Sequence, residues 1–356
     1  MDRSGDIDKI RLAVISDGKP GHENQSLGIA EHIPDSDILL LRHNLRESVP
    51  EFLLRLQTRF TSNWKADPRP LLNRIFPREE IEQLVSHKPE AVIAAGTLSA
   101  APCLLAGALT GAKTCICMKP SMLRLSKFDL AVVPEHDNPP DTSKIVRTKA
   151  APNRVSPERL SDEWEVWKGE LPGDGNVISW VIGGPSASAG FDSSRVLDAL
   201  EKSLEWAEKN NVQVWLSTAR RTPESLEESI LKLSETRRSL TWTLLWHRDQ
   251  RNPLYAMFHR SKLAIVTSDS VSMIAEAASA GMGPVVLRAG EKSTGQITKQ
   301  DRMVDKIVSA GYGTRADPSD NLVEILSGML TRDTEFPCLD DTSKAADRLL
   351  QIIGRR

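Results

Sequence analysis

One glutamate stands among small residues in the stretch IVTSDSVSMIAEAASAG, which runs from 265 to 281. Apolar residues lead into a Ser-Asp-Ser turn that contains Asp269 and Ser270, and the residues after it favour a helix. Ser272 and Glu276 are four residues apart, so a helix places them on one face. A carboxylate in these early turns can accept two hydrogen bonds from a vicinal diol such as a ribose. The alternative is a solvent-facing glutamate that meets the helix dipole, which is worth only about 0.3–1 kcal/mol.

Two further loops in the same half of the chain contain residues suited to anions. The stretch VIGGPSASAGFD offers the amides of Gly183 and Gly184 and the hydroxyl of Ser186, which suits a phosphate nest. A flexible turn is the alternative. The stretch LSTARRTPES places Arg220 and Arg221 just before a Thr-Pro pair that begins a helix, which forms either an anion site or a solvated basic turn.

The three stretches together indicate more than each does alone. Micromolar binding needs about 8 kcal/mol, whereas one charge-assisted hydrogen bond supplies about 1.5–3 kcal/mol. No single loop is therefore sufficient. A glycine-rich amide loop, paired arginines and a diol acceptor acting together can hold a nucleoside diphosphate.

The N-terminal half contains two candidates for a general base. Asp17 and His22 stand in SDGKPGHENQSLG, directly after the first predicted strand. This loop is not a GxGxxG motif, so dinucleotide binding is not indicated. His136 lies between two acidic residues, one of them Asp137, at the end of another predicted strand, and neighbouring carboxylates can tune a histidine as a base. The alternative for both loops is a polar surface turn.

Other kinds of chemistry find no support in the sequence. The 46 basic and 48 acidic residues give a formal net charge of -2, so there is no general attraction to nucleic acid. There is no HExxH, GxSxG, Walker loop or zinc-ligand spacing, and we expect no metal site. The four cysteines form no CxxC pair, and we expect Cys115 and Cys117, two residues apart in one strand, to be buried reduced thiols. The other two are Cys103 and Cys338.

Two segments bear on membranes. Residues 91–112 run for 22 residues without a charge, which is long enough to span a bilayer. Their many small residues and a proline favour instead a buried strand, a turn at Gly96-Thr97 and a helix with Ser99 near its cap. No signal-peptide-like stretch precedes the first strand, so we expect a cytoplasmic protein. Residues 51–76 mix Arg, Lys, Trp and Phe and form either a peripheral membrane contact or an ordinary amphipathic helix pair.

Along the sequence, short apolar runs alternate with segments of helical pattern. This alternation is typical of βαβ units, which form parallel sheets and would position these residues. The runs expected as strands are 11–16, 37–41, 91–95, 113–118, 129–134, 144–148, 176–184, 212–218, 241–246, 262–267 and 283–287. The predicted fold class is α/β, with two Rossmann-like domains facing a central cleft. Ligands of open parallel sheets bind beyond the strands' carboxyl ends, which is where the residues above lie.

Composition also suggests domain boundaries. We expect an N-terminal domain over 1–150 on the acceptor side and a Pro- and Gly-containing connector over 151–175. A nucleotide-binding domain over 176–335 follows, and an amphipathic helix within 336–356 packs back on the first domain.

Seven stretches, in order along most of the chain, resemble the elongated-mitochondria fission family, which has bacterial members. They are DGKPGHENQSLG, DLAVVPEHD, APNRV, VIGGPS, ARRTP, NPLYAMF and TSDSVSMIAEAASAG. The resemblance implies a two-domain fold similar to that of GT-B glycosyltransferases, which generally need no metal.

The chain is also similar to the lipid-linked N-acetylglucosaminyltransferases of peptidoglycan synthesis. Their glycine-rich first loop ends in a histidine, as GKPGH does at His22, and Gly183-Gly184-Pro185-Ser186 resembles their Gly-Gly-Ser loop. Their ribose-binding glutamate corresponds to Glu276. Their interdomain GNP segment is only echoed by KAAPNR, where Lys149 and Ala150 stand in place of the expected glycine.

Two functions follow as hypotheses. The first is an inverting, metal-independent glycosyltransferase that uses a nucleotide-diphosphate sugar as co-substrate and no other cofactor. Its C-terminal half would hold the donor, and His22 would be the base, with His136 or Asp137 as second choice. The acceptor is unknown, with a lipid-linked molecule as one option, and neither a nucleic-acid partner nor an oligomeric state is indicated. The second hypothesis is a non-catalytic recruitment protein on the same fold, as the fission proteins imply.

Overall fold

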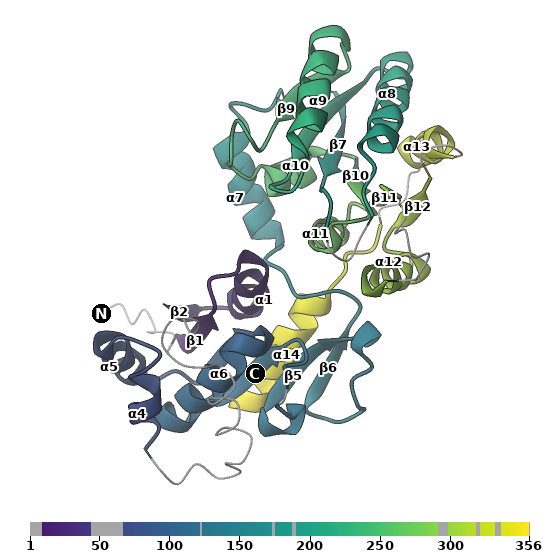
Figure 1. The fold of residues 1–356 in the computed structure, drawn as a ribbon. Helices are drawn as coiled ribbons and strands as arrows, with labels where there is room; N and C mark the ends of the chain where they lie inside the picture. The colour runs from purple at the N-terminus through teal and green to yellow at the C-terminus, as the bar shows by residue number, and fades with distance from the viewer. Residues whose placement is uncertain are drawn as a thin grey trace, which may run out of the picture. The chain divides into compact units, whose positions relative to one another are not determined.

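The computed structural model describes residues 9–43, 67–121, 123–172, 175–186, 190–290, 298–317, 321–331 and 336–355. The chain divides into two compact units, each built around a parallel sheet (Figure 1). Unit 1 comprises Met1–Arg154 and Asp340–Arg356, and unit 2 comprises Val155–Leu339.

Unit 1 is an α/β layer structure with six described strands in the order β2-β1-β3-β4-β5-β6. The strands are β1 (Ile10–Ser16), β2 (Ser36–Arg42), β3 (Ala91–Ala95), β4 (Lys113–Cys117), β5 (Leu130–Pro134) and β6 (Ile145–Thr148). The helices are α1 (Pro20–Glu31), α4 (Arg69–Leu72), α5 (Arg78–His87), α6 (Gly96–Thr110) and α14 (Asp341–Ile353), with short 3-10 turns η1 (Leu125–Lys127) and η2 (Glu135–Asp137).

The sheet of unit 1 is covered by helices on both faces, and its central strands are mostly apolar and buried. Successive side chains of a strand point to opposite faces. Ala13 and Ile15 of β1 accordingly pack with α4, α5 and α6, and Leu12 and Val14 pack with α1 and α14. Burial on both faces is why these strands read as continuous apolar runs in the sequence.

Unit 2 repeats this architecture with the order β12-β11-β10-β7-β8-β9. Its strands are β7 (Asn176–Ile182), β8 (Val212–Thr218), β9 (Leu240–Leu244), β10 (Leu263–Thr267), β11 (Val285–Leu287) and β12 (Thr314–Ala316). Its helices are α7 (Pro157–Trp167), α8 (Ser193–Lys209), α9 (Glu224–Thr236), α10 (Leu254–Arg260), α11 (Val271–Ser279), α12 (Lys299–Ser309) and α13 (Leu322–Leu330).

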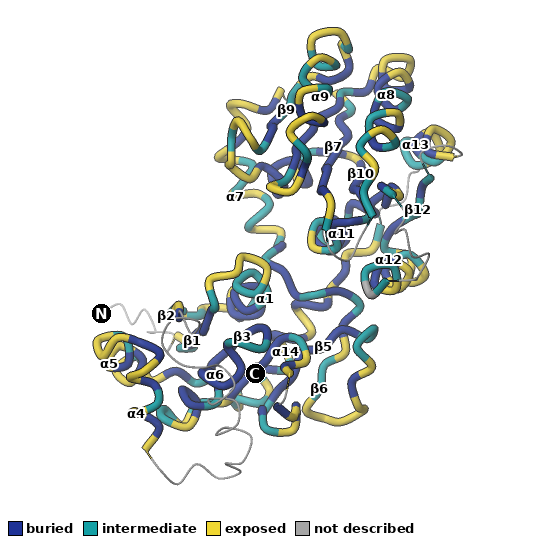
Figure 2. Tube along the Cα trace, in the orientation of Figure 1, coloured by how far each residue is buried: buried dark blue, intermediate teal, exposed yellow. Residues whose placement is uncertain are grey.

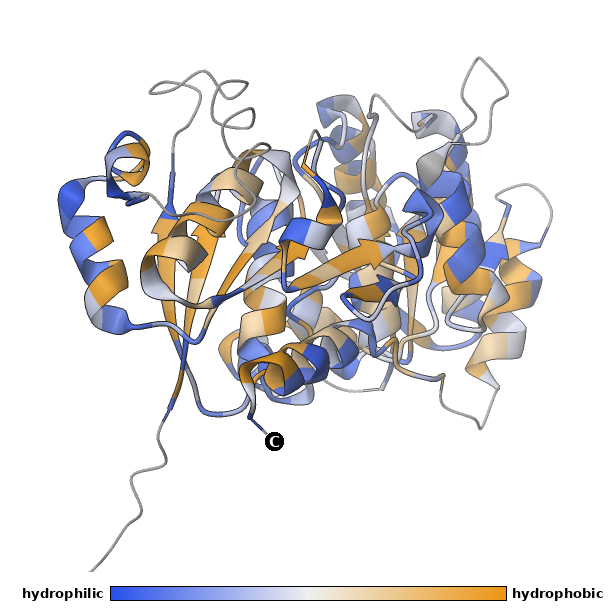
Figure 3. Cartoon of the chain, turned by 90° about the horizontal axis from the view of Figure 1, so that it is seen from below, coloured by the Kyte–Doolittle hydropathy of each residue, from blue (hydrophilic) through white to orange (hydrophobic). Residues whose placement is uncertain are grey.

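The core of unit 2 follows the same rule. Ile178, Trp180 and Ile182 of β7 pack with α8, α9 and α13 on one face. In both units the central strands are buried, while the outer sides of helices such as α5, α8 and α9 are exposed (Figure 2). The strands are correspondingly apolar, and helices such as α5 alternate apolar and polar sides (Figure 3).

These elements confirm the expected α/β class with parallel sheets, and the expected strands agree within about two residues. β12 was not expected, because three residues without an apolar run give no periodic signal. The expected Gly96-Thr97 turn is wrong. Gly96 adopts φ 78° and turns the chain from β3 into α6 directly, so Ser99 lies inside that helix and accepts or donates a hydrogen bond at His43 Nε2, 3.0 Å away.

The expected connector over 151–175 does not form a separate piece in its described part. Unit 1 extends to Arg154, and α7 belongs to unit 2, where it packs against α10. Trp167 anchors α7 because its buried ring meets Trp242 edge-on at 6.0 Å. The chain enters unit 2 after Arg154 and returns to unit 1 after Leu339. The backbone N–H of Leu339 donates to the carbonyl oxygen of Ala278 in unit 2. α14 is part of unit 1 and packs against α1.

Candidate functional site

The three nucleotide loops expected from the sequence lie side by side in unit 2. β10, β7 and β8 are neighbouring parallel strands, so their carboxyl ends reach the same edge of the sheet. Val181 pairs with Val266, and Ile182 pairs with Thr218. The glycine loop, the twin arginines and the start of α11 therefore emerge next to one another.

Gly183 and Gly184 bring these loops into contact. The N–H of Gly183 donates to Thr267 Oγ1 at 2.8 Å, and that of Gly184 donates to Asp269 Oδ2 at 2.7 Å. A Cβ on Gly183 would lie 2.0 Å from Asp269 Oδ2, and one on Gly184 would lie 2.0 Å from the carbonyl oxygen of Arg221. In this arrangement both amides are used inside the protein and are not available to a phosphate. The half-buried Ser186 follows, before residues outside the described ranges.

Asp269 connects the loops electrostatically. The residue is 1% exposed, and its Oδ2 accepts from Gly184 and lies 3.6 Å from Arg221 Nη2. Burial raises the pKa of Asp269, while the Gly184 N–H and the Arg221 charge oppose that shift. Arg220 and Arg221 are exposed, so both guanidinium groups can meet an anion at this edge.

The start of α11 is open to such an anion. Ser270 precedes the helix and is buried, whereas Ser272 is exposed. Among the described residues, no side chain caps the first amides of α11. Uncapped N–H groups at a helix start bind phosphate and carboxylate groups, because the helix dipole adds to their hydrogen bonds.

Glu276 lies in the second turn of α11 and is 9% exposed. Its one hydrogen bond among the described residues comes from the hydroxyl of Tyr255, 3.5 Å from Oε1. The guanidinium of Arg159 lies over the Tyr255 ring, 5.7 Å from its centre. Burial raises the pKa of Glu276 to about 7. The solvent-facing alternative for Glu276 is therefore wrong, and its carboxylate has acceptor capacity that the described residues do not fill.

In unit 1, Asp17 and His22 form a pair at the carboxyl end of β1. His22 Nδ1 lies 3.0 and 3.1 Å from the two oxygens of Asp17, whose side chain is 2% exposed. The His22 ring packs on Gly96, where a Cβ would lie 2.5 Å from Cε1. A buried carboxylate that holds Nδ1 leaves Nε2 for proton transfer, which is the arrangement of a general base.

The second-choice base lies elsewhere on the same sheet. His136 and Asp137 form part of η2, which follows β5, and His136 Nε2 is 4.0 Å from Asp137 Oδ2. The His22 ring lies against Gly96 at the end of β3, and one strand, β4, separates β3 from β5. At about 4.8 Å per strand, the ends of β3 and β5 are roughly 10 Å apart, so the two candidates lie at different strand ends.

Sequence reasoning missed a buried carboxylate in unit 2. Glu227 of α9 is 3% exposed and accepts from the Thr218 hydroxyl at 2.5 Å. Its neighbours Leu226 and Ile230 face the core. A glutamate on the buried side of an amphipathic helix is a signal that the sequence offered, because such a group is rarely buried without partners.

Two findings bear on metals and membranes. Across the described ranges, no group of three or more His, Cys, Asp or Glu side chains is arranged to hold a metal ion. No helix in that part of the chain is long and apolar enough to cross a bilayer. Most of the proposed membrane-contact segment 51–76, up to residue 66, lies outside the described residues.

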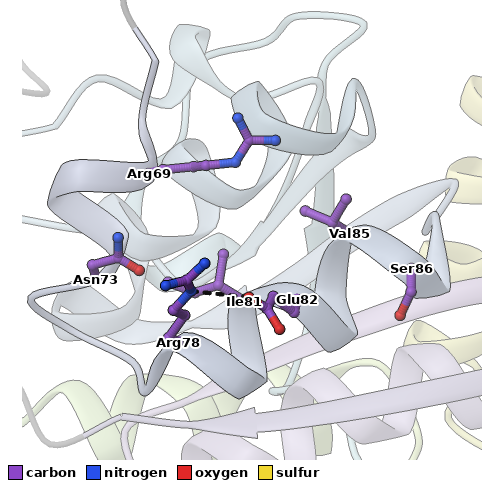
Figure 4. Close-up of a pocket in the computed structure, with 7 residues that line it drawn as sticks. All are labelled: Arg69, Asn73, Arg78, Ile81, Glu82, Val85 and Ser86. Carbon is purple, nitrogen blue, oxygen red and sulfur yellow. Dashed lines mark hydrogen bonds and ion pairs between the residues drawn. The ribbon is translucent and has the colours of Figure 1, made fainter.

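A surface hollow of about 290 Å³ lies between α4 and α5, and none of its lining residues is an expected site residue (Figure 4). Two arginines line it, but each pairs with a carboxylate. Arg78 donates to Glu82 at 3.0 Å, and Arg69 lies 3.4 Å from Asp67. This neutralisation leaves little attraction for an anion, so the hollow is not a strong candidate site.

Comparison with known families decides the membership of the chain. A family model described as Mitochondrial fission ELM1 matches residues 20–353. The chain belongs to this family. No curated protein sequence matches this member of the ELM1 family.

Solved structures show which fold this ELM1-family chain adopts. It is similar to the UDP-GlcNAc 2-epimerase of Methanocaldococcus jannaschii, with a TM-score of 0.61 and 14% identity over 97% of this chain and 99% of that one. It is also similar to the E. coli ADP-heptose lps heptosyltransferase II, with a TM-score of 0.51 and 12% identity over 90% and 98% of the two chains. The fold is GT-B-like, and it occurs in an epimerase as well as in a transferase.

Proposed function

We propose that this ELM1-family protein is a glycosyltransferase whose unit 2 binds a nucleotide-diphosphate sugar. The observation that carries the proposal is Glu276. It is a buried carboxylate with a single long hydrogen bond among the described residues, next to an uncapped helix start and two exposed arginines. Burying such a group costs free energy unless partners satisfy it, and the two hydroxyls of a ribose would do so.

In this proposal each part of the loop cluster has a role. Glu276 accepts two hydrogen bonds from the ribose, and the first amides of α11 with Arg220 and Arg221 bind the diphosphate. The same amides and guanidinium groups would stabilise charge on the leaving diphosphate without a metal. Asp269 would hold the loops in register, because Gly184 and Arg221 both contact it.

His22 is assigned the proton transfer. Its Nε2 would accept the proton of an acceptor hydroxyl, while Asp17 holds Nδ1. The acceptor oxygen would then form its bond to the anomeric carbon as the bond to the diphosphate oxygen breaks on the opposite face, which inverts the configuration. The proposed acceptor is a hydroxyl compound, with a lipid-linked one among those to test.

Isothermal titration with UDP, ADP, GDP and TDP tests donor binding. We expect at least one of them to bind, and Glu276→Ala to weaken it by tenfold or more, since hydrogen bonds to charged groups are worth about 1.5–3 kcal/mol each. Glu324→Ala is the matched control, because Glu324 is an exposed glutamate of α13 in the same unit. Failure of all four nucleotides to bind, or equal affinities of wild type and Glu276→Ala, would contradict the proposal.

The second candidate is a recruitment protein without catalysis, because the description of the family names mitochondrial fission and no sugar transfer. Such a protein needs neither an uncompensated buried carboxylate nor a histidine held by a buried aspartate. Product analysis separates the two. Release of nucleoside diphosphate that depends on His22 supports transfer, whereas nucleotide binding without turnover for any tested acceptor supports recruitment. Conversion of the donor sugar without an acceptor would instead indicate an epimerase.

A further inference from the structure

Unit 2 contains a second histidine that a buried carboxylate holds. Nδ1 of His247 lies 3.1 Å from Glu227 Oε2, and the backbone N–H of His247 donates to the same oxygen at 3.2 Å. Glu227 is fixed in turn by the hydroxyl of Thr218. The His247 side chain is 38% exposed although its partner is buried. The ring is thus held on its Nδ1 side and open to solvent on its Nε2 side.

This pair lies at the edge of the sheet where the nucleotide loops lie. The N–H of Trp246, one residue before His247, donates to Thr218 Oγ1 at 2.8 Å. Thr218 ends β8 and pairs with Ile182 at the end of β7. Arg220 follows Thr218 by two residues. His247 therefore stands beside the arginine loop, one strand further from the glycine loop.

The charges around His247 favour an anion. Arg220, Arg221 and Arg248 are exposed there. Of the carboxylates on the same loops, Asp249 pairs with Arg251 at 2.6 Å, Asp269 faces Arg221, and Glu227 holds His247 itself. Glu224 in the first turn of α9 is the exposed exception.

We propose that His247 binds the diphosphate of the nucleotide donor through Nε2 and that Glu227 is its positioning residue. This inference rests on the proposed function of unit 2. Glu227 lies at Nδ1, so Nε2 is the ring nitrogen left to donate a hydrogen bond to a phosphate oxygen. The buried carboxylate fixes the ring before the ligand arrives, so little rotamer freedom is lost on binding.

The test uses the full chain with two variants and a control. His247→Gln removes the imidazole ring, and Glu227→Gln removes the carboxylate that holds the ring at Nδ1. Arg238→Gln removes one cation from the turn before β9, at the opposite edge of the sheet. Titrations measure affinity for the best-bound nucleoside diphosphate, for its nucleoside and for inorganic pyrophosphate. We expect His247→Gln to bind the nucleoside diphosphate and pyrophosphate about tenfold or more weakly than wild type. Its affinity for the nucleoside should not change, and Arg238→Gln should bind all three ligands as wild type does.

A spectroscopic readout separates positioning from mere structural support. In wild type labelled at histidine nitrogens, pyrophosphate should shift the Nε2 resonance of His247, which would be its contact atom. In Glu227→Gln the same shift should need about tenfold more pyrophosphate. If Glu227→Gln does not fold, His247→Gln alone decides the matter, because its side chain is exposed and its loss leaves the core intact.

The outcomes distinguish this inference from the function on which it rests. If Glu276→Ala weakens nucleotide binding and His247→Gln does not, the role of His247 is overturned and the donor site stands. If pyrophosphate binding depends on His247 but no nucleotide responds to Glu276, the diphosphate contact stands and the glycosyltransferase proposal fails. If neither nucleotide nor pyrophosphate binds the wild type, both are overturned.

Discussion

Glu276 shows at the scale of one residue how a binding group can weaken the protein that carries it. Burial raises its pKa to about 7, so the folded protein holds a proton on Glu276 over a pH range in which the unfolded chain has lost it. Wherever the folded state binds more protons, the free energy of unfolding falls as pH rises. Stability should therefore decrease from about pH 4.5 to pH 7 on account of this group.

Replacing Glu276 by glutamine should remove that pH dependence. Glutamine stays neutral at every pH. The free energy of unfolding of Glu276→Gln should therefore exceed that of wild type by up to about 3 kcal/mol at pH 8, and the two should be almost equal at pH 4. Urea unfolding followed at several pH values measures this, with Glu324→Gln as the exposed control. A parallel displacement of the whole pH curve, rather than a difference that grows with pH, would show that ionisation of Glu276 is not the cause.

At the scale of elements, the site depends on how closely three strand ends approach. Gly184 touches the backbone of the β8 loop, and Gly183 touches Asp269 at the end of β10. Any side chain at these positions must push two strands' loops apart. The glycines thus set the distance between the arginines and the start of α11, rather than donating their own amides to a ligand.

Gly184→Ala should separate the loops. Its Cβ would lie 2.0 Å from the carbonyl oxygen of Arg221, a backbone atom that cannot turn aside, so we expect a loss of about 1–3 kcal/mol in unfolding free energy. Nucleoside diphosphate affinity should fall as well. Gly328→Ala in α13 is the control, since nothing lies within 4 Å of its added Cβ. It should be neutral or stabilise the protein by about 0.5–1 kcal/mol. Thermal unfolding and titration of both variants check this, and equal behaviour would refute the packing role.

At the scale of the whole molecule, the two ends of the chain build unit 1 together. Asp341 begins α14, and its Oδ2 accepts from the backbone N–H groups of Lys149 and Ala150 at 2.7 and 2.9 Å. The hydroxyl oxygen of Thr342 accepts from the N–H of Asn153 at 3.0 Å. The KAAPNR segment is thus fastened to a helix that lies about 190 residues later in the chain, and unit 1 cannot be completed until that helix is made.

Loss of the Asp341 carboxylate should loosen this closure. Asp341→Ala leaves two backbone N–H groups without their acceptor, and we expect a loss of about 2–3 kcal/mol. Asp341→Asn, which keeps one acceptor oxygen, should lose less. Asp340→Ala removes a neighbouring exposed carboxylate that pairs with Lys344 and should cost less than about 1 kcal/mol. Amide hydrogen exchange at Lys149 and Ala150 is the measurement, and unchanged protection in Asp341→Ala would refute the closure.

The sequence by itself determined the two sheets and the loops that matter. Strands buried on both faces are mostly apolar, so the predicted bounds of β3 and β8 agree with the structure to the residue. Ligand groups of parallel sheets gather at carboxyl ends, which also directed attention to Arg220, Glu276 and His22. The fold class followed from these local signals, whereas the resemblance of seven motifs indicated the family, which the match of the family model over residues 20–353 confirms.

Only the tertiary structure decided which polar groups are hydrogen-bonded within the protein and which keep hydrogen-bonding capacity for a ligand. The acceptor for the Gly184 amide is Asp269, 85 residues away, and no local pattern could show that this amide is taken. Burial of Glu276 and the pairing of Glu227 with His247 likewise depend on neighbours from other elements. The physical reason is that hydrogen-bond satisfaction and desolvation are properties of the packed environment, whereas periodicity and turn chemistry are properties of the chain.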